Sequence, residues 1–215
     1  VNSLIIEQFF FKMTLSIVAS NPVTKELCVA TMTFLVAVGD IVPMVIPGVG
    51  SIAVQAKVKP SNRFKILELM KNGHTPESAI NNVLENDKLR KHRQIIGINH
   101  EGNGHVFSGS KTIDISDYFI GKNFVIAGNM LASKKVVSSM ATSFEKNNGI
   151  FFPKRCLLSL FEGDKIGGDK RGRMSASLIY SIPNKKNMTL RIDYSNNPLK
   201  ELFEALELRY TKKYE

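Results

Sequence analysis

The chain has 215 residues, of which 43% are hydrophobic and 22% charged, and its formal net charge at pH 7 is +10. This composition is typical of a soluble globular protein and excludes collagen-like, mucin-like and wholly disordered classes. A domain of this length buries roughly 70% of the surface that its unfolded chain exposes, so we expect a large core. The lysines are spread along the sequence without a nucleic-acid-binding motif, which favours a solvated basic surface over a nucleic-acid interface.

The longest apolar stretch runs from Leu35 to Val49 and contains Asp40 and two prolines. It is shorter than the roughly 20 residues that a membrane helix needs, so we expect no membrane span. Neither Cys28 nor Cys156 has a His or Cys neighbour at metal-ligand spacing, so we expect no metal. We expect both cysteines to be free buried thiols in a cytoplasmic protein, and a disulfide between them is the alternative.

Residues 1–13 have no regular patterning and form an expected N-terminal extension, either a mis-called start or a pro-segment. They lack the basic start of a signal peptide, and Glu7 and Gln8 interrupt their apolar part. Residues 14–215 are expected to form a single domain. A start at Met13 would place Thr14 second, where it is small enough for the methionine to be removed.

The first half of the domain predicts hairpins and one pair of helices. Turn residues at 21–26 and at 102–104 separate alternating apolar runs. Capping residues at Ser61 and Thr75 precede the helical patterns 61–73 and 75–87. The predicted strands are Thr14–Ser20, Leu27–Phe34, Val49–Lys57, Arg93–Glu101 and His105–Thr112.

The second half repeats this arrangement and ends on a helix. The predicted elements are a strand Asn123–Ala132, helices Ser133–Asn148 and Pro153–Gly163, strands Ser175–Pro183 and Met188–Tyr194, and a terminal helix carrying Leu199, Leu202, Phe203, Leu206 and Leu208. Clustered hairpins with helices in pairs predict an α+β fold, in which two mainly antiparallel sheets pack face to face between helices.

Six runs in this order cover almost everything after Met13. They are MTLSIVASNPVTKEL (Met13–Leu27), VAVGDIVPMVIPGVGSIAVQA (Val36–Ala56), RQIIGI (Arg93–Ile98), NFVIAGNML (Asn123–Leu131), GGDKRGRMSASL (Gly167–Leu178) and LRIDYSNNPLKEL (Leu190–Leu202). Together they resemble the bacterial and archaeal family known as domain of unknown function 1028. The resemblance implies an Ntn-hydrolase-like fold, which is a four-layer αββα sandwich, and it carries no settled substrate.

The resemblance also implies a nucleophile at the mature N-terminus, which is Thr14 here. A free α-amine, with a pKa of about 8, can take the proton of the neighbouring hydroxyl near neutral pH. In the 215-residue chain the nitrogen of Thr14 is a peptide amide, so removal of the extension is a condition. The alternative is that Thr14 is only the first β-branched residue of a strand.

Two further segments are expected to supply the oxyanion donors and the substrate-binding residues of the site. The backbone N–H of Gly128 and the side-chain amide of Asn129 are candidate oxyanion donors, and a plain strand-to-helix turn is the alternative. Asp169, Arg171 and Arg173 lie on a glycine-rich loop that could hold a substrate carboxylate through an arginine fork. Alternatively, the aspartate and the first of these arginines pair with each other. The loop lacks the GK[ST] ending of a phosphate-binding loop, which disfavours a nucleotide-binding role.

Ser16 and Gln55, on strands that we expect to be neighbours, are candidates to line the same cleft, with ordinary strand packing as the alternative. The histidines match no triad or metal motif and are expected at the surface; they are His74, His92, His100 and His105.

The chain departs from the family pattern at Met44, Lys59, Ser108–Gly109 and Thr112–Ile120, so the specificity of the pocket could differ or activity could be lost.

The leading hypothesis is therefore an N-terminal-nucleophile amidohydrolase. It would cleave a small amide or peptide-like bond with Thr14. We expect it to use no cofactor or metal and to bind neither a membrane nor a nucleic acid. Whether it forms a homo-oligomer is left open. The first alternative is a catalytically silent relative that binds a small ligand or a partner, and the second is a nucleic-acid-binding protein, marked by salt-sensitive retention.

Overall fold

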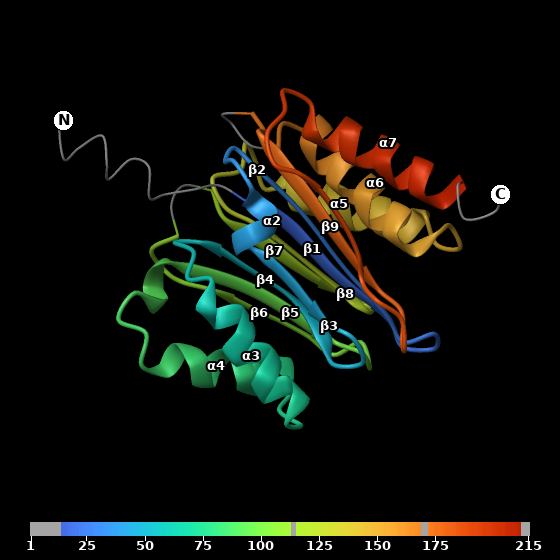
Figure 1. Cartoon of the computed structure of the whole chain (residues 1–215). Coiled ribbons are helices and arrows are strands. Elements are labelled where there is room, and N and C mark those ends of the chain that lie inside the picture. The colour runs from blue at the N-terminus through green and yellow to red at the C-terminus, as the bar shows by residue number, and fades with distance from the viewer. Residues whose placement is uncertain (1–13, 113–114, 169–171, 212–215) are drawn as a thin grey trace.

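The structure is a computed structural model, and it describes residues 14–112, 115–168 and 172–211. Two antiparallel sheets pack face to face, and helices cover both outer faces (Figure 1). The four-layer αββα architecture predicted from the sequence is confirmed.

The larger sheet has six strands, and each is antiparallel to its neighbours. Across the sheet they run β10 (Met188–Ile192), β9 (Ser175–Ser181), β2 (Glu26–Thr33), β1 (Thr14–Asn21), β8 (Phe124–Gly128) and β7 (Asp117–Gly121). The strand β1 is central and buried along almost its whole length, with β2 on one side and β8 on the other.

The smaller sheet has four strands, in the order β3 (Pro43–Ile46), β4 (Gly50–Ala56), β5 (Arg93–Asn99) and β6 (Gly104–Ser108). The strands β4 and β5 lie opposite β1, so the start of β1 and the end of β4 meet at one end of the sandwich.

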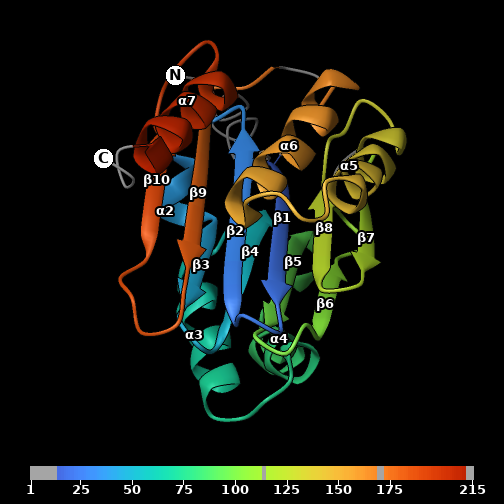
Figure 2. The ribbon, with the colours of Figure 1, turned by 90° about the vertical axis from the view of Figure 1, so that its right-hand side faces the viewer.

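Helices α3 (Ser61–Lys71) and α4 (Pro76–Glu85) cover the smaller sheet, while α5 (Lys135–Lys146), α6 (Phe152–Lys165) and α7 (Pro198–Thr211) cover the larger one (Figure 2). Two short elements, α2 (Val38–Ile41) and the 3₁₀ helix η1 (Arg90–His92), lie in connections. None of the helices in the described part of the chain combines the length and the hydrophobicity of a membrane span.

The opening hairpin is confirmed, because β1 pairs with β2 and Thr14 lies opposite Thr33. Thr75 also caps α4 as predicted, since its side chain accepts from the N–H of Ser78. The prediction that Ser61 caps α3 was wrong. The helix already includes Ser61, and the preceding Pro60 has no side chain that can cap it.

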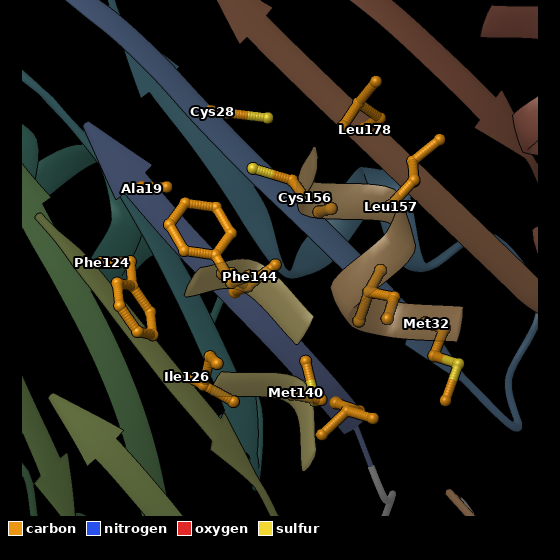
Figure 3. Packing of buried hydrophobic residues seen from close by; sticks show 14 of the residues in the cluster. Ala19, Cys28, Met32, Phe124, Ile126, Met140, Phe144, Cys156, Leu157 and Leu178 are labelled. Atoms are coloured by element: carbon orange, nitrogen blue, oxygen red, sulfur yellow. The ribbon is translucent and has the colours of Figure 1, made fainter. Parts of the chain in front are cut away.

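Side chains of β1 alternate between two cores. Leu15 and Ile17 pack against the helices of the larger sheet, whereas Val18 points into the layer between the sheets. Figure 3 shows the helix-side core, where Cys28 and Cys156 point their sulfur atoms toward each other. Both cysteines are free and buried, as expected, and burial raises the pKa of the Cys28 thiol.

Candidate functional site

Thr14 is the first residue of β1 and lies at the end of the sandwich where the two sheets meet. Because side chains alternate along a strand, Thr14 and Ser16 share the face that points toward the smaller sheet. Only 1% of the surface of Thr14 is exposed in the 215-residue chain. Its hydroxyl therefore belongs to the layer between the sheets rather than to the helix-covered core.

Two rows of hydroxyl groups cross the larger sheet at this position. Residues directly opposite in antiparallel strands place their side chains on the same face. The first row runs Thr14, Thr33, Ser175 and the second runs Ser16, Thr31, Ser177. Within the rows, Thr14 Oγ1 donates to Thr33 Oγ1 at 3.5 Å, and Ser16 Oγ lies 2.8 Å from Thr31 Oγ1. All six side chains are buried.

Three carboxamide side chains meet the backbone of β1 and β8 at the same end. Gln55 Nε2 lies 3.3 Å from the Thr14 carbonyl oxygen, 3.1 Å from that of Ala127 and 2.8 Å from Gln94 Oε1. The same Gln94 oxygen accepts from Asn129 Nδ2 at 3.0 Å. These three side chains, Gln55, Gln94 and Asn129, form what we call the amide cluster, and each is at most 2% exposed.

The amide cluster is not fully paired. Gln94 Nε2 donates to the Gly128 carbonyl at 3.1 Å and to Ser108 Oγ at 3.2 Å, which uses both of its hydrogens. In contrast, Gln55 Oε1 is buried and has no hydrogen-bond partner among the described residues. Buried acceptors are normally paired, so this oxygen is an open position for a donor such as a water or a ligand N–H.

The backbone around the amide cluster is strained. Gln55 is followed by Ala56 at φ 64°, and Asn129 is followed by Met130 at φ 54°. Left-handed φ values cost residues other than glycine of order 1–3 kcal/mol, and such residues concentrate at functional sites. The two carboxamides are thus each held at a point where the chain turns sharply away from its strand.

The predicted oxyanion candidates lie beside Thr14. Leu15 is paired with Gly128, and the Asn129 N–H reaches the Thr14 carbonyl oxygen at 3.4 Å. One hydrogen of the Asn129 amide is engaged by Gln94, which leaves the other for a further acceptor.

Of the predicted glycine-rich loop, Asp169 and Arg171 lie outside the described residues. Arg173 is described, and its Nη1 donates to Asp164 Oδ1 at 2.9 Å. Its Nε is buried and has no partner in the described part of the chain. Burial raises the pKa of the Asp164 carboxyl, an effect that its pairing with Arg173 opposes. The next residue, Met174, donates its N–H to the Thr33 carbonyl at 2.9 Å, so the loop ends beside the strand that pairs with Thr14.

Ser16 and Gln55 lie on facing sheets rather than on adjacent strands of one sheet. His74 is exposed, whereas His92, His100 and His105 are half-buried. Across residues 14–112, 115–168 and 172–211, no three His, Cys, Asp or Glu side chains are grouped to hold a metal ion.

Gln94 and the residues that complete the hydroxyl rows were not predicted. The rows do leave a signal, because Ser or Thr recurs at every second position in "TLS", "TMT" and "SAS" on three strands. Gln94 leaves none, since a single glutamine in a strand gives no indication of what faces it.

We expect Gln55→Leu to lower the free energy of unfolding by about 2–3 kcal/mol, because it leaves Gln94 Oε1 and the Ala127 carbonyl short of a donor. Urea unfolding would show a lower midpoint with an unchanged slope. As a control, Asn82→Leu on the exposed face of α4 should stay within about 0.5 kcal/mol of the parent. Equal midpoints for the two variants would show that the amide cluster adds nothing to stability.

The model of a family of unknown function, DUF1028, matches residues 14–202. The crystal structure of protein SPO2555 from Silicibacter pomeroyi, described with the same family model, is similar to this chain. The two are 30% identical, the similarity covers 93% of this chain and 86% of that one, and the TM-score is 0.85.

Two weaker likenesses are to Anbu proteins. Anbu (ancestral beta-subunit) from Yersinia bercovieri is 8% identical, with a TM-score of 0.41 over 93% of this chain and 96% of that one. The Anbu (Gly-1) mutant from Hyphomicrobium sp. strain MC1 is 13% identical, with a TM-score of 0.40 over 94% and 100% of the two chains. No curated protein matches the sequence.

Proposed function

Since the chain belongs to the DUF1028 family, we propose that, once its N-terminus is Thr14, it is an amidohydrolase that cleaves a small amide or peptide-like bond. The observation that carries this proposal is the place of Thr14. Its side chain lies in the layer between the sheets, and its backbone carbonyl oxygen accepts a hydrogen bond from Gln55 of the amide cluster. The family match beginning at Thr14 supports the same start.

In the proposed mechanism Thr14 supplies both nucleophile and base. Its free α-amine takes the proton of Oγ1, and the oxygen attacks the carbonyl carbon of the bound amide. The tetrahedral intermediate collapses to a threonine ester, and the α-ammonium gives its proton to the leaving nitrogen. A water molecule, deprotonated by the same amine, then hydrolyses the ester and restores the hydroxyl.

The oxyanion of each tetrahedral intermediate needs donors that are already oriented. We assign this role to the second N–H of the Asn129 side chain. The backbone N–H of Gly128 is not assigned, because the alternation that directs the Asn129 N–H to Thr14 directs the Gly128 N–H toward β7. Asn129 is suited to it because its amide is buried and held by Gln94. Donors fixed in a water-excluded site stabilise developing charge without reorganising.

Substrate binding is proposed for groups with unused capacity near Thr14. Gln55 Oε1 would accept the N–H of a substrate amide, and Arg173 Nε would donate to an anionic group. Ser16 lies deeper on the same face as Thr14 and would border the pocket. Arg171 would be a second donor to this anionic group, and Asp169 is the other residue of the proposed substrate-binding loop. The proposed compartment is the cytoplasm, where free cysteines persist.

A second candidate is a relative without catalytic activity that binds a small ligand at this end. The observation that favours it is the 1% exposure of Thr14, whose nitrogen in the 215-residue chain is part of a peptide bond. The proposed chemistry therefore depends on removal of residues 1–13.

The test compares the 215-residue chain with a chain that begins Met13–Thr14 and loses its methionine. Both would be assayed on acetyl, succinyl and benzoyl p-nitroanilides, with the N-terminus of each checked by intact mass. We expect turnover only from the chain that begins at Thr14, because only that chain has a free amine beside the hydroxyl.

Adding one residue before Thr14 gives the matched control, since it restores the peptide bond and changes little else. This control should be inactive. Equal activity of the chains with free and blocked Thr14 would contradict the proposal. Binding of these anilides without turnover by the Thr14 chain would favour the second candidate.

A further inference from the structure

A groove of about 870 Å³ lies far from Thr14, between the end of α7, the loop that joins β9 to β10, and Phe151. We call it the α7 groove and define it by Phe151, Tyr180, Lys185, Lys186, Leu206 and Arg209. In Figure 2, α7 crosses the upper part of β9 and β10, and both strands continue below it toward their connecting loop. The groove occupies the helix-side face that α7 leaves uncovered.

The α7 groove and the Thr14 site lie at opposite ends of the larger sheet. Ser175 begins β9 in the same row as Thr14, whereas Tyr180 lies near the other end of that strand. Five residues of extended strand separate the two, which is about 17 Å. A ligand in the α7 groove would therefore not occupy the proposed acyl site.

The floor of the α7 groove is aromatic and aliphatic. The rings of Phe151 and Tyr180 meet edge to face, with centroids 5.7 Å apart, and Tyr210 lies 4.5 Å from Phe151 on the other side. Tyr180 is buried and Phe151 is half-buried, so their ring contact holds the exposed part of Phe151 in place as an apolar surface. Such a surface suits the hydrocarbon part of a ligand.

Every charged side chain that lines the α7 groove is a cation. Lys185 and Lys186 lie on the loop after β9, and Arg209 lies in the last turns of α7. All three are exposed, and none forms an ion pair with a residue that the structure describes. The nearby carboxylate of Glu26 accepts hydrogen bonds from the Tyr180 hydroxyl and from Thr24, and within the described part of the chain it forms no ion pair with these three cations. The groove thus combines an apolar floor with a rim of three cations.

We propose that the α7 groove binds an amphipathic carboxylate, which is an alkyl chain of medium length that ends in one carboxylate group. The chain would lie along Phe151 and Met188, which are both half-buried and line the groove, and the carboxylate would meet Lys186 and Arg209 at the rim. The volume falls within the roughly 300–1,000 Å³ of ligand pockets. Charge complementarity selects an anion, and the apolar floor selects an alkyl chain over a compact polar anion such as phosphate.

The test is calorimetric titration of the 215-residue protein with decanoate, below its micelle-forming concentration. We expect one molecule bound per chain, and octanoate about tenfold weaker, since each methylene contributes about three- to fourfold in affinity. Decanol, which has the same chain without the charge, should bind at least tenfold more weakly than decanoate.

Two variants test whether decanoate binds in the α7 groove. Lys185→Glu with Lys186→Glu should weaken decanoate at least tenfold, whereas Lys65→Glu with Lys71→Glu, on exposed positions of α3, should leave it within twofold at the same net charge. Thr189→Trp, at an exposed position that lines the groove, should block binding by filling it. Circular dichroism checks that each variant is folded.

Three results would overturn the proposal. They are no binding of decanoate, equal binding of decanoate and decanol, and equal weakening by the two lysine pairs. None of these results depends on whether Thr14 is catalytic.

Discussion

Thr14→Ala should reduce turnover of a p-nitroanilide substrate by about 10⁴-fold or more, to the background rate, in the chain that begins at residue 14. The hydroxyl is the only group in the proposed mechanism that bonds covalently to the substrate. Its loss removes that bond but little packing, because among the described residues the hydroxyl makes one long hydrogen bond of 3.5 Å, to Thr33. We therefore expect the variant to unfold at nearly the same urea concentration as the parent.

Two matched variants accompany Thr14→Ala. Thr14→Ser keeps a hydroxyl next to the amine and should retain measurable turnover. Ser16→Ala removes the neighbouring hydroxyl on the same face, which bonds to Thr31, and should leave turnover within tenfold of the parent. If Thr14→Ala kept parental activity in a chain of verified N-terminus, another residue would have to be the nucleophile.

Asn129→Ala should lower kcat by about 10²–10³-fold, which is the cost of removing one oxyanion donor. The side chain is 2% exposed, and within the described part of the chain its one hydrogen bond runs to Gln94 at 3.0 Å. The second N–H would act on the oxyanion, which exists only in the intermediate. We therefore expect kcat and kcat/KM to fall together while KM changes little.

Because Asn129→Ala also removes a partner of Gln94, a control must separate the two effects. Ser108→Ala removes a different partner of Gln94, at 3.2 Å, and leaves Asn129 in place. We expect this control to change kcat by less than tenfold. If both variants lowered kcat equally, Asn129 would act only by positioning Gln94. If neither variant lowered kcat, the Asn129 side chain would have no role in turnover.

The hairpins and paired helices of the sandwich could be predicted from the sequence because their turns and caps are local. The predictions missed β3, which is four residues long and lies within a Gly/Pro-rich stretch, and β7, whose Tyr118 and Ile120 are each 50% exposed. Neither sequence alternates apolar and polar residues, because PMVI is apolar throughout and DYFIG has three apolar residues in a row. Tertiary pairing rather than local pattern therefore defines both strands.

The candidate site was predictable only in part. Thr14 could be identified from the family resemblance together with its position directly after Met13, and Asn129 because it lies at the end of an apolar strand. Gln55 was proposed on an adjacent strand, although it reaches Thr14 from the facing sheet. Contacts between facing sheets depend on how the layers stack, and neither periodicity nor turn chemistry encodes that stacking.

The most direct test of the central claim is covalent labelling of Thr14 by a β-lactone, read by intact mass and peptide mapping. An N-terminal threonine with a free amine opens the lactone through Oγ1 and retains its whole mass as an ester. We expect one adduct per chain, on the peptide that begins with Thr14, and none on the 215-residue chain or on Thr14→Ala. An unlabelled Thr14 chain, or equal labelling of all three proteins, would contradict the claim that Thr14 is the nucleophile.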